Sequence, residues 1–388
     1  MHDDWIDTVL GEIVRIRSGV SPTNAALAER GIHPFVKVDD LNLSRKYLAE
    51  ARQFTEDEKL CVPAGSILFA KRGAAIMVNK VRIAARQLAL DTNMMALTPV
   101  RGKVDGEFLY YFILHQELAR IADVSSIPQI NNKHINPYPI SLPPLPEQRK
   151  ISEILRTWDE ALEKIGALKE AKERQYHWLQ QRLLNHKPAR RKWASVELGA
   201  IICQRSEHSR EHNEYPVLTS SRRGLFLQSD YFSKQVTSAD NTGYKIMRHG
   251  DFTFRSMSDD GRFVFNRLEE HEAGIISPAY GVFFSTGVYP AFLLHFLNSV
   301  YFSQLLSRET QGGTRKALRF SALAQMEVDL PNREDQERIS AILDEALREI
   351  ALIDAEIEAL IRQKRGLMQK LLTGAWRVNT TAATEGTQ

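Results

Sequence analysis

The sequence predicts a duplicated, mixed α/β (α+β) fold with a pseudo-twofold internal repeat. We expect two globular domains separated by two long helices that pair as an antiparallel coiled coil. Three observations predict this fold: a repeat at an offset of 188 residues, short strand-like runs in each copy, and one long amphipathic segment closing each copy.

The repeat is clearest where a proline-rich stretch leads into a helix. LPPLPEQRKISEIL begins at Leu142 and LPNREDQERISAIL at Leu330, so that Gln148 aligns with Gln336. WIDTVLGEI (5–13) matches WASVELGAI (193–201) in the same way, whereas the offset drifts by about three residues between these ends. A long period with similar ends and a divergent middle indicates duplication of a whole domain together with its helix.

Each copy begins with a domain of roughly 140 residues, which is an ordinary domain size. Its apolar runs are short and are separated by Gly, Pro and Asn, as expected of strands in a mixed α/β domain. These runs are SILFA, VRIAA and FLYYFIL in copy one, and DFTFRSM, RFVFN and GVFFS in copy two. We place the domains at residues 1–144 and 188–331, the helices at 145–187 and 332–375, and a flexible tail at 376–388.

Each closing segment continues for about 38 residues without a helix-breaking cluster, and at ~1.5 Å per residue would form a helix roughly 55–60 Å long. Gly166 and Gly366 are isolated interruptions. Apolar residues return every seven positions, for example Ile151, Trp158 and Ile165, and form a stripe wider than a strict coiled-coil seam. So long a stripe would stay wet on an isolated helix, so we expect the two helices to pair and to act as a spacer between the domains.

Composition excludes several classes of protein. The 388 residues are 43% hydrophobic and 26% charged, which indicates a globular protein. No apolar run approaches the ~20 residues of a membrane helix, and MHDDWIDTVLGEI has no signal-peptide core. We therefore expect a cytoplasmic protein with no membrane partner, in which Cys61 and Cys203 are reduced. The net charge of +3 does not by itself demand nucleic acid.

Motifs of common catalytic sites are missing from the sequence. It contains no GxxxxGK[ST] phosphate loop, no HExxH and no CxxC pair, and we expect no metal site. SPAY (277–280) and NPYP (136–139) approach the [DNS]PP[YF] tetrapeptide of amino-methyltransferases, but both lack its second proline. Turns at strand ends explain both stretches well. The sequence therefore favours a binding protein with no catalytic residues.

Basic residues are unevenly distributed and favour DNA as the ligand. Between Lys59 and Leu90 there are six Lys or Arg residues and no acid, and KRG follows a predicted strand. Arg, Lys, Ser and Asn on loops are the residues that grip phosphates and read base edges. For any single residue a solvated loop explains the sequence equally well, but the clusters together favour contact. The candidate DNA-binding residues are Lys37, Lys71, Arg72, Asn79, Lys80, Arg82, Arg222, Arg223, Arg255, Ser256 and Arg262.

Over residues 5 to 375 the sequence resembles the specificity (S) subunit of type I restriction–modification systems. The resemblance is carried by the doubled proline–helix motif, by QINNKHINPYPISLPPL and GSILFAKRGA in copy one, and by YPVLTSSRRGL and IISPAYGVFF in copy two. It implies two target-recognition domains that each bind one half of a bipartite site in double-stranded DNA. It also implies that the helices set the spacing between the half-sites and dock the modification subunits.

The resemblance further implies which other proteins and cofactors take part. Two modification (methyltransferase) subunits and the restriction (helicase-nuclease) subunits are the expected partners. S-adenosylmethionine, ATP and Mg are expected on those subunits and not on this chain. The partner-docking residues it suggests are Pro144, Glu147, Gln148 and Gln336. Copy two reads PNREDQ where copy one reads PPLPEQ, so the second motif is more polar.

Two other functions stay open at this point. The chain is alternatively the DNA-reading scaffold of a related phage-defence methyltransferase system, or a cryptic adenine methyltransferase that uses SPAY or NPYP. Neighbouring genes separate the first alternative from a type I system, since only the latter is flanked by a helicase-nuclease reading frame. Binding of S-adenosylmethionine by the isolated chain would favour the second.

Overall fold

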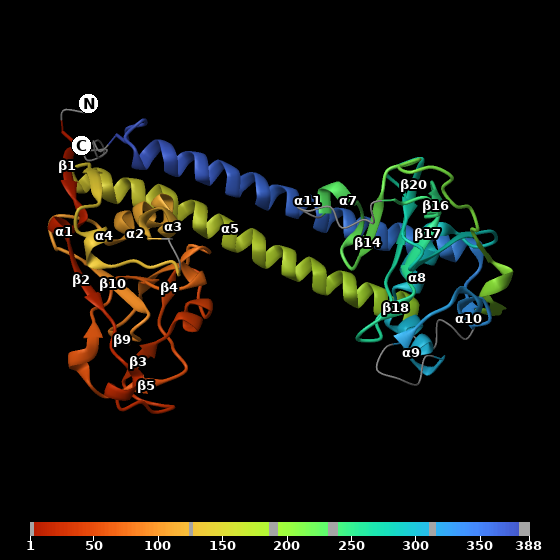
Figure 1. The fold of residues 1–388 in the computed structure, drawn as a ribbon, viewed down its shortest axis with the longest axis horizontal. Helices are drawn as coiled ribbons and strands as arrows, with labels where there is room; N and C mark the ends of the chain where they lie inside the picture. The colour runs from red at the N-terminus through yellow and green to blue at the C-terminus, as the bar shows by residue number, and fades with distance from the viewer. Residues whose placement is uncertain (1–3, 124–126, 186–192, 232–239, 310–315, 380–388) are drawn as a thin grey trace, which may run out of the picture. The chain divides into compact units, whose positions relative to one another are not determined.

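The computed structural model describes residues 4–123, 127–185, 193–231, 240–309 and 316–379 (Figure 1). The chain divides into two compact units: unit 1 comprises residues 1–166 and 356–388, and unit 2 comprises residues 167–355. Each unit therefore contains one α/β domain together with part of both long helices. No helix in the described ranges is long and apolar enough to cross a membrane.

The domain of unit 1 is built on a five-stranded sheet with the order β2-β10-β7-β8-β4. Only β4 is parallel to its neighbour in this sheet. A four-stranded sheet (β5-β3-β9-β6) and the pair β1-β11 complete the domain. The strands are β1 Ile6–Val9, β2 Val14–Ser18, β3 His33–Val36, β4 Tyr47–Leu48, β5 Phe54–Thr55, β6 Cys61–Val62, β7 Ile67–Ala70, β8 Val81–Ala84, β9 Leu88–Leu90, β10 Met94–Pro99 and β11 Pro139–Leu142. The short helices are α1 Leu10–Ile13, η1 Pro22–Asn24, η2 Val38–Asn42, η3 Glu58–Leu60, η4 Ala74–Ile76, α2 Gly106–Gln116, α3 Leu118–Ile121 and α4 Asn132–Ile135.

The domain of unit 2 is built on a four-stranded sheet with the order β13-β21-β17-β19. The pairs β12-β23, β14-β15, β16-β20 and β18-β22 surround this sheet. The strands are β12 Ala194–Glu197, β13 Ile202–Gln204, β14 Leu218–Ser221, β15 Gly224–Leu227, β16 Lys245–Arg248, β17 Phe252–Arg255, β18 Met257–Ser258, β19 Phe265–Arg267, β20 Ala273–Ile276, β21 Tyr280–Ser285, β22 Lys316–Ala317 and β23 Glu327–Leu330. The short helices are η6 Leu198–Ala200, α7 Gln228–Tyr231, α8 Pro290–Leu297, α9 Val300–Glu309 and α10 Phe320–Ala324.

The two domains share one frame, which confirms the predicted duplication. The strands β1 and β11 match β12 and β23 at an offset of 188 residues. In the middle of the domains Ile67 of β7 corresponds to Phe252 of β17, so the offset has fallen to 185 there. The strand order β2-β10-β7-β8 is repeated as β13-β21-β17-β19. At the same offset of 185, β3, β6 and β9 of the four-stranded sheet correspond to β14, β16 and β20. The antiparallel pair β6-β9 is repeated as β16-β20, so the copies share strands beyond the first sheet.

One predicted strand is wrong. FLYYFIL (108–114) lies within helix α2, where residues from Phe108 to Ile113 are buried. An unbroken apolar run does not distinguish a buried strand from a buried helix by its period. The decisive signal lies just before the run, because the Asp105 carboxylate caps the helix by accepting a hydrogen bond from the N–H of Phe108 at 3.0 Å. In copy two, RFVFN becomes a strand only at Phe265, and Arg262 lies in the turn before it.

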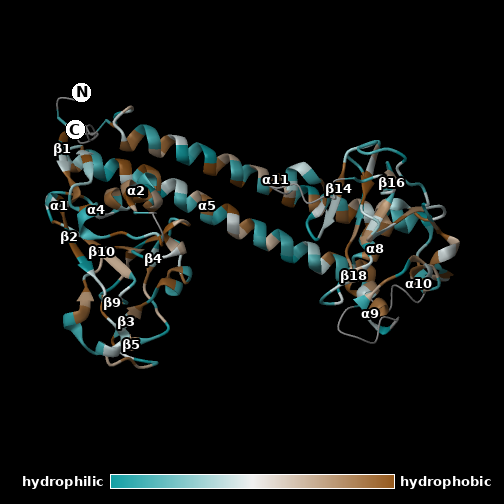
Figure 2. Ribbon diagram, in the orientation of Figure 1, coloured by the Kyte–Doolittle hydropathy of each residue, from teal (hydrophilic) through white to brown (hydrophobic). Residues whose placement is uncertain are grey.

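The long helices are α5, Leu145–Gln180, which continues as a π-helical turn at Gln181–Asn185, and α11, Arg333–Leu372. In unit 2 the ion pairs Lys169–Asp354, at 2.6 Å, and Lys172–Glu349, at 2.7 Å, show that they pair antiparallel, as predicted. Hydrophobic and hydrophilic residues alternate along both helices (Figure 2). Because a two-helix seam is narrow, some apolar side chains stay outside it, such as Leu168 of α5, which is 48% exposed.

Each domain packs on the start of its own helix and on the end of the other. In unit 1, Leu155 of α5 and Leu371 of α11 join one buried apolar cluster with the domain. In unit 2, Leu343 of α11 and Leu184, just after α5, do the same. A fully buried Leu side chain stabilises the folded state by about 1.5–3 kcal/mol, so these helix ends are integral to the domains.

Polar contacts repeat at these junctions with different residues. Tyr111 of α2 donates a hydrogen bond to Asp159 of α5 at 2.5 Å, and Lys364 of α11 binds the same carboxylate. In unit 2, Nε2 of His295 in α8 lies 2.7 Å from Oδ1 of Asp344 in α11, and Tyr176 of α5 lies beside that histidine. Tyr176 stands 188 residues before Lys364, so the two occupy equivalent positions on the incoming helix. Burial raises the pKa of Tyr176 to about 12.

The start of the expected flexible tail is bound to unit 1. Arg377 forms ion pairs with Asp4 at 2.7 Å and with the buried Glu147 at 2.8 Å. The indole of Trp5 donates to the same Glu147 carboxylate at 3.3 Å. A buried carboxylate needs such partners, which explains why this part of the tail is held. The rest of the predicted tail, 380–388, lies outside the described residues.

Candidate nucleic-acid interface

The same backbone clamp holds the end of one sheet strand in both domains. After β7, the Lys71 carbonyl accepts a hydrogen bond from the N–H of Ile130 at 2.8 Å. After β17, the Ser256 carbonyl accepts one from the N–H of Leu318 at 2.9 Å. These partners are related by the offsets of the repeat, so both domains fix the base of an equivalent loop. Candidate basic residues lie at this strand end in each copy.

In unit 1 the strand end carries Lys71 and Arg72. Lys71 is half-buried, and burial lowers the pKa of its amine although the nearby Asp91 carboxylate opposes that effect. Arg72 is exposed and forms no ion pair with any residue in the described ranges. Gly73 has a φ of +88°, which favours glycine, and its N–H donates to the Pro128 carbonyl at 2.9 Å. The turn therefore presents Arg72 to solvent from a fixed backbone.

The other candidates of unit 1 have partners inside the domain. The Arg82 guanidinium donates to the carbonyls of Leu41 at 3.0 Å and Ser44 at 2.8 Å. The Asn79 side chain links two backbone groups at the α2–α3 junction, the Leu114 carbonyl and the Leu118 N–H. The Lys37 amine donates to Gln53 at 2.6 Å, and that of Lys80 to Asn42. A DNA contact by any of these four residues stays a prediction.

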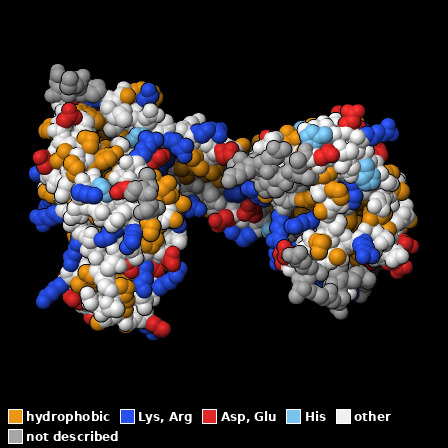
Figure 3. Space-filling model, viewed as in Figure 1, with side chains coloured by type: hydrophobic (Ala, Val, Ile, Leu, Met, Phe, Trp, Pro, Cys, Tyr) orange, Lys and Arg blue, Asp and Glu red, His pale blue; other side chains and the backbone are white. Residues whose placement is uncertain are grey.

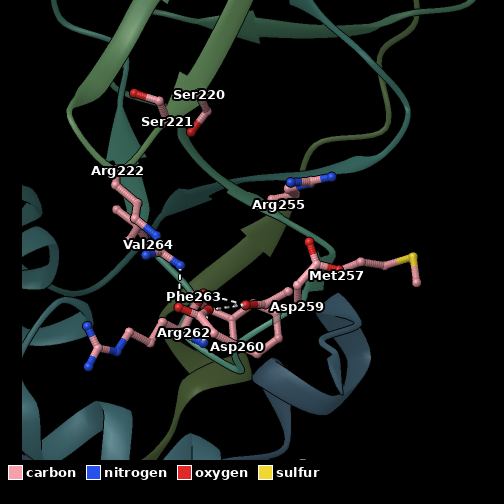
Figure 4. Close-up of a pocket in the computed structure, with 11 residues that line it drawn as sticks. Ser220, Ser221, Arg222, Arg255, Met257, Asp259, Asp260, Arg262, Phe263 and Val264 are labelled. Carbon is pink, nitrogen blue, oxygen red and sulfur yellow. Dashed lines mark hydrogen bonds and ion pairs between the residues drawn. The ribbon is translucent and has the colours of Figure 1, made fainter. Parts of the chain in front are cut away.

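In unit 2 three candidate arginines come together around one cavity of about 320 Å³ (Figure 4). Arg222 reaches it from the turn between β14 and β15, Arg255 from the end of β17, and Arg262 from the turn before β19. Within the described part of the chain, Arg255 and Arg262 form no ion pair. Ser221, Met257 and Phe263 also line the cavity, so it presents cations, a hydroxyl and apolar surface together.

The remaining candidates of unit 2 lie elsewhere. Arg223 stacks over the ring of Tyr231 at 5.2 Å and lines a different hollow, beside β15 and β19. Ser256 is half-buried, and its N–H donates to the Ala279 carbonyl at 3.0 Å. Adjacent residues in the sequence, Arg222 with Arg223 and Arg255 with Ser256, are therefore separated by the fold.

The acidic residues of this cavity were not among the predicted site residues. Asp260 forms an ion pair with Arg222 at 2.5 Å, and its other oxygen accepts from Ser258 and from the backbone of Arg262. The Arg262 N–H, followed by Arg222 and Ser258, lowers the pKa of Asp260 to about 2. Asp259 also lines the cavity. In the sequence, Asp259-Asp260-Gly261 indicates a turn, and only the basic residues around it indicate DNA binding.

The predicted docking residues are mostly inside the fold. Gln148 and Gln336 are buried with exposures of 1% and 6%, and Glu147 is buried beside Arg377. Pro144 is exposed. Docking by these four residues stays a prediction, and the three buried side chains would act through the surface they support rather than by direct contact.

The two near-motifs of methyltransferases form turns. Within SPAY, the N–H of Tyr280 donates to the Ser277 carbonyl at 3.0 Å, between β20 and β21. Within NPYP, the carbonyls of Asn136 and Tyr138 accept hydrogen bonds from the backbone of helix α1. In the described residues no group of His, Cys, Asp and Glu is placed to hold a metal ion.

Lys and Arg side chains are spread across the face of unit 1 that Figure 3 shows, with hydrophobic side chains among them. They do not form one continuous basic surface there. Binding of a polyanion would therefore depend on particular side chains, such as Arg72, rather than on net charge.

Comparison with known proteins points to one family. A profile of the type I restriction modification DNA specificity domain matches the chain twice, over residues 2–173 and 192–362. The type I restriction enzyme MjaVIII specificity subunit of Methanocaldococcus jannaschii is 23% identical, covering 97% of this chain and 94% of the relative. The putative type I restriction enzyme MjaX specificity subunit of the same organism is 25% identical, covering 97% and 95%.

Solved structures share the fold. The crystal structure of the type I restriction-modification S subunit of M. genitalium matches with a TM-score of 0.53 and 13% identity, covering 96% of this chain and 97% of that chain. A chain from a study of complex assembly and conformational transition of the type I R-M system matches with a TM-score of 0.61 and 18% identity, covering 95% and 98%. These similarities confirm the duplicated two-domain fold.

Proposed function

The chain belongs to the type I restriction–modification DNA specificity family, and from that premise we propose that each of its two domains reads one half of a bipartite site in double-stranded DNA. The chain carries two copies of the family's domain, and it is the sequence-specific DNA-recognition subunit of a type I system. The division of the target between the two copies is the part that we infer.

One observation supports the inference that the two domains read different halves of the target. In both domains, basic side chains stand at the end of the equivalent sheet strand above the same backbone clamp, but the side chains differ. Unit 1 offers Arg72 on a glycine turn, whereas unit 2 offers Arg222, Arg255 and Arg262 around a cavity. Base edges in the major groove are discriminated by the identity and geometry of such side chains. The two domains therefore read different half-sites.

The long helices supply the spacing and the docking surface. Apolar side chains stay exposed on them, and exposed apolar residues in a group mark interaction surfaces. In unit 2 these are Leu168, Trp178, Ile342, Leu347 and Leu352. We assign this surface to two modification (methyltransferase) subunits, with the restriction (helicase-nuclease) subunits joining the same complex.

The chain itself is not a catalyst in this proposal. Its sequence has no cofactor loop, and its two near-motifs are turns that hold backbone groups. S-adenosylmethionine, ATP and Mg²⁺ would be bound by the partner subunits. Methyl transfer and cleavage would then require those subunits.

Two experiments test the proposal. Purified chain mixed with S-adenosylmethionine and DNA is expected to transfer no methyl group until modification subunits are added. Methylome sequencing of cells that carry the complete system is expected to give a split motif with two different halves. Methyl transfer by the isolated chain, or a methylated motif without a gap, would overturn it. A neighbouring helicase-nuclease gene separates the type I assignment from a related phage-defence system.

A further inference from the structure

Arg222 forms an ion pair with Asp260 across the cavity of unit 2. It leaves the turn between β14 and β15, and one amino group of its guanidinium lies 2.5 Å from the Asp260 carboxylate (Figure 4). A guanidinium has five N–H donors in a rigid fork. Among the described residues, the Arg222 side chain donates a hydrogen bond only to Asp260, so its other donors remain for a ligand.

The turn that carries Asp260 is itself rigid. Ser258 is buried, and its hydroxyl contacts both Asp260, at 3.0 Å, and the Arg262 carbonyl, at 2.9 Å. Gly261 has a φ of +75°, and a side chain there would meet Lys316 of β22 at 2.7 Å. The pairing of β18 with β22 holds the other side of the turn. The carboxylate therefore has a fixed position.

The hairpin that carries Arg222 is anchored as well. Asn266 of β19 donates to the Ser220 hydroxyl at 2.7 Å and to the Ser221 carbonyl at 2.9 Å. The Tyr280 hydroxyl donates to the Ser220 carbonyl at 3.3 Å. Side chains that are fixed before binding lose less conformational entropy when they bind, which favours selective contacts.

The charges around the cavity favour a base edge over a phosphate. Asp259 and Asp260 line it together with Arg222, Arg255 and Arg262. A phosphate would be repelled by both carboxylates, and a site built only for phosphate gains nothing from them. Arginine, in contrast, reads O6 and N7 of guanine with two parallel hydrogen bonds, and a neighbouring carboxylate accepts from the amino group of cytosine.

We propose that Arg222, oriented by Asp260, is a specificity-determining residue of the second domain and reads a guanine in its half-site through the major groove. This inference rests on the proposed function. It predicts a guanine at one position of that half-site, and it assigns to Asp260 the role of orienting the fork rather than of binding the backbone of the DNA.

The test is selection of bound duplexes by the full-length chain from a library of randomised DNA, followed by sequencing. Arg222→Ala and Arg222→Lys are expected to reduce the preference for guanine at that position about 5- to 150-fold. The lysine variant keeps the charge but loses the fork, so it separates geometry from charge. Asp260→Asn is expected to weaken the same preference while total affinity for unselected DNA holds or rises, because a negative charge has been removed.

Matched controls lie in the same domain but outside the cavity. Arg210→Ala removes an exposed cation and Asp230→Asn an exposed carboxylate, and both are expected to keep the guanine preference. Thermal unfolding of every variant shows whether it is folded, and Arg222→Lys preserves the test if Arg222→Ala is not.

Three outcomes are distinguishable. Loss of one guanine from the selected motif in the Arg222 and Asp260 variants alone supports the inference. Arg222→Ala could instead lower the affinity equally for all sequences, leave the motif unchanged, and reduce the slope of log affinity against log salt concentration by about one. Arg222 would then be a phosphate contact, and the inference would be overturned. If the wild-type chain selects no bipartite motif, the proposed function fails instead.

Discussion

Gln148 and Gln336, which stand 188 positions apart, form the same two hydrogen bonds in their respective units. Each side-chain amide donates to the carbonyl of the proline five residues earlier, Pro143 or Pro331, at 2.8 Å. Each side-chain carbonyl accepts, also at 2.8 Å, from the N–H of the N-cap residue that precedes a domain helix, Asp105 before α2 or Tyr289 before α8. The repeated glutamine therefore ties the start of a long helix to the domain in front of it.

Replacing Gln148 by Ala should destabilise the protein. The substitution leaves the Asp105 N–H and the Pro143 carbonyl buried without partners, which costs about 2 kcal/mol. Urea denaturation of the full-length chain measures the loss as a lower midpoint, and Gln336→Ala should behave alike. Arg149→Ala, at the exposed neighbouring position, should change stability by less than about 0.5 kcal/mol. Equal midpoints for Gln148→Ala and Arg149→Ala would contradict the structural role.

Arg72 and Arg82 should respond differently to removal, although both belong to one basic segment. Arg72 is exposed, and its loss should weaken specific DNA binding by about 1–3 kcal/mol if it makes a bidentate base contact. Arg82 holds the Leu41 and Ser44 carbonyls, so Arg82→Ala should lower stability first. Binding titrations at several salt concentrations, together with thermal unfolding, separate the two effects. If Arg72→Ala changes neither affinity nor salt dependence, Arg72 is an ordinary surface residue.

Matched insertions of seven residues after Ala167 and after Ala355 should lengthen the spacing between half-sites. Seven residues add ~10 Å of helix and preserve the heptad phase, so the apolar seam continues beyond the insertion. At ~3.4 Å per base pair the selected target should have halves about three base pairs further apart, with unchanged half-site sequences. Methylome sequencing of a strain with this variant measures the gap.

Insertions of two residues at the same places serve as the comparison. They rotate everything beyond them by roughly 200°, which exposes the apolar stripe and should unfold the helix pair. An unchanged gap in the seven-residue variant would mean that something other than α5 and α11 sets the spacing.

Gly366→Ala should stabilise unit 1. Gly366 lies inside α11, and an added Cβ meets nothing within 4 Å. Alanine in a helix interior is favoured over glycine by about 0.5–1 kcal/mol. Gly261→Ala is the opposite case, because a φ of +75° strains any residue other than glycine and the Lys316 side chain would also have to move. Thermal unfolding should therefore show a higher midpoint for the first variant and a lower one for the second.

The two cysteines should differ in reactivity and in pH dependence. Burial raises the pKa of the Cys61 thiol to about 11, so at pH 8 only about one molecule in 10³ carries the thiolate there. Cys203 is exposed. Iodoacetamide followed by mass spectrometry should label Cys203 first, and Cys61 only near pH 11 or after unfolding.

The sign of the linkage follows from the same pKa. Folding raises the pKa of Cys61 above its ordinary value of 9.0, so the folded state favours the protonated thiol. This contribution to stability is complete below about pH 9 and is lost as the pH rises towards 11. Rapid labelling of Cys61 in the folded protein at pH 8 would contradict its burial.

The sequence by itself determined the duplication and the long helices. Both can be recognised from the spacing of residues in the sequence. The aligned motifs at Leu142 and Leu330 reveal the repeat. The seven-residue period of α5 and α11 depends only on neighbours along the chain. Strands β7 and β17 were also predicted, together with the drift in offset between them. Helix α2 was missed because its apolar run has no distinctive period.

Only the tertiary structure decided which basic residues are available to DNA. Arg72 and Arg82 lie ten positions apart with similar neighbours, but the second is occupied by carbonyls about 40 residues away in the sequence. The role that we propose for Arg222 depends on a distant partner in the same way, because Asp260 stands 38 residues further along the chain. Composition and period carry no information about such pairs. They arise when β14, β17 and β19 bring distant turns together, and burial then determines which charges must be satisfied within the protein.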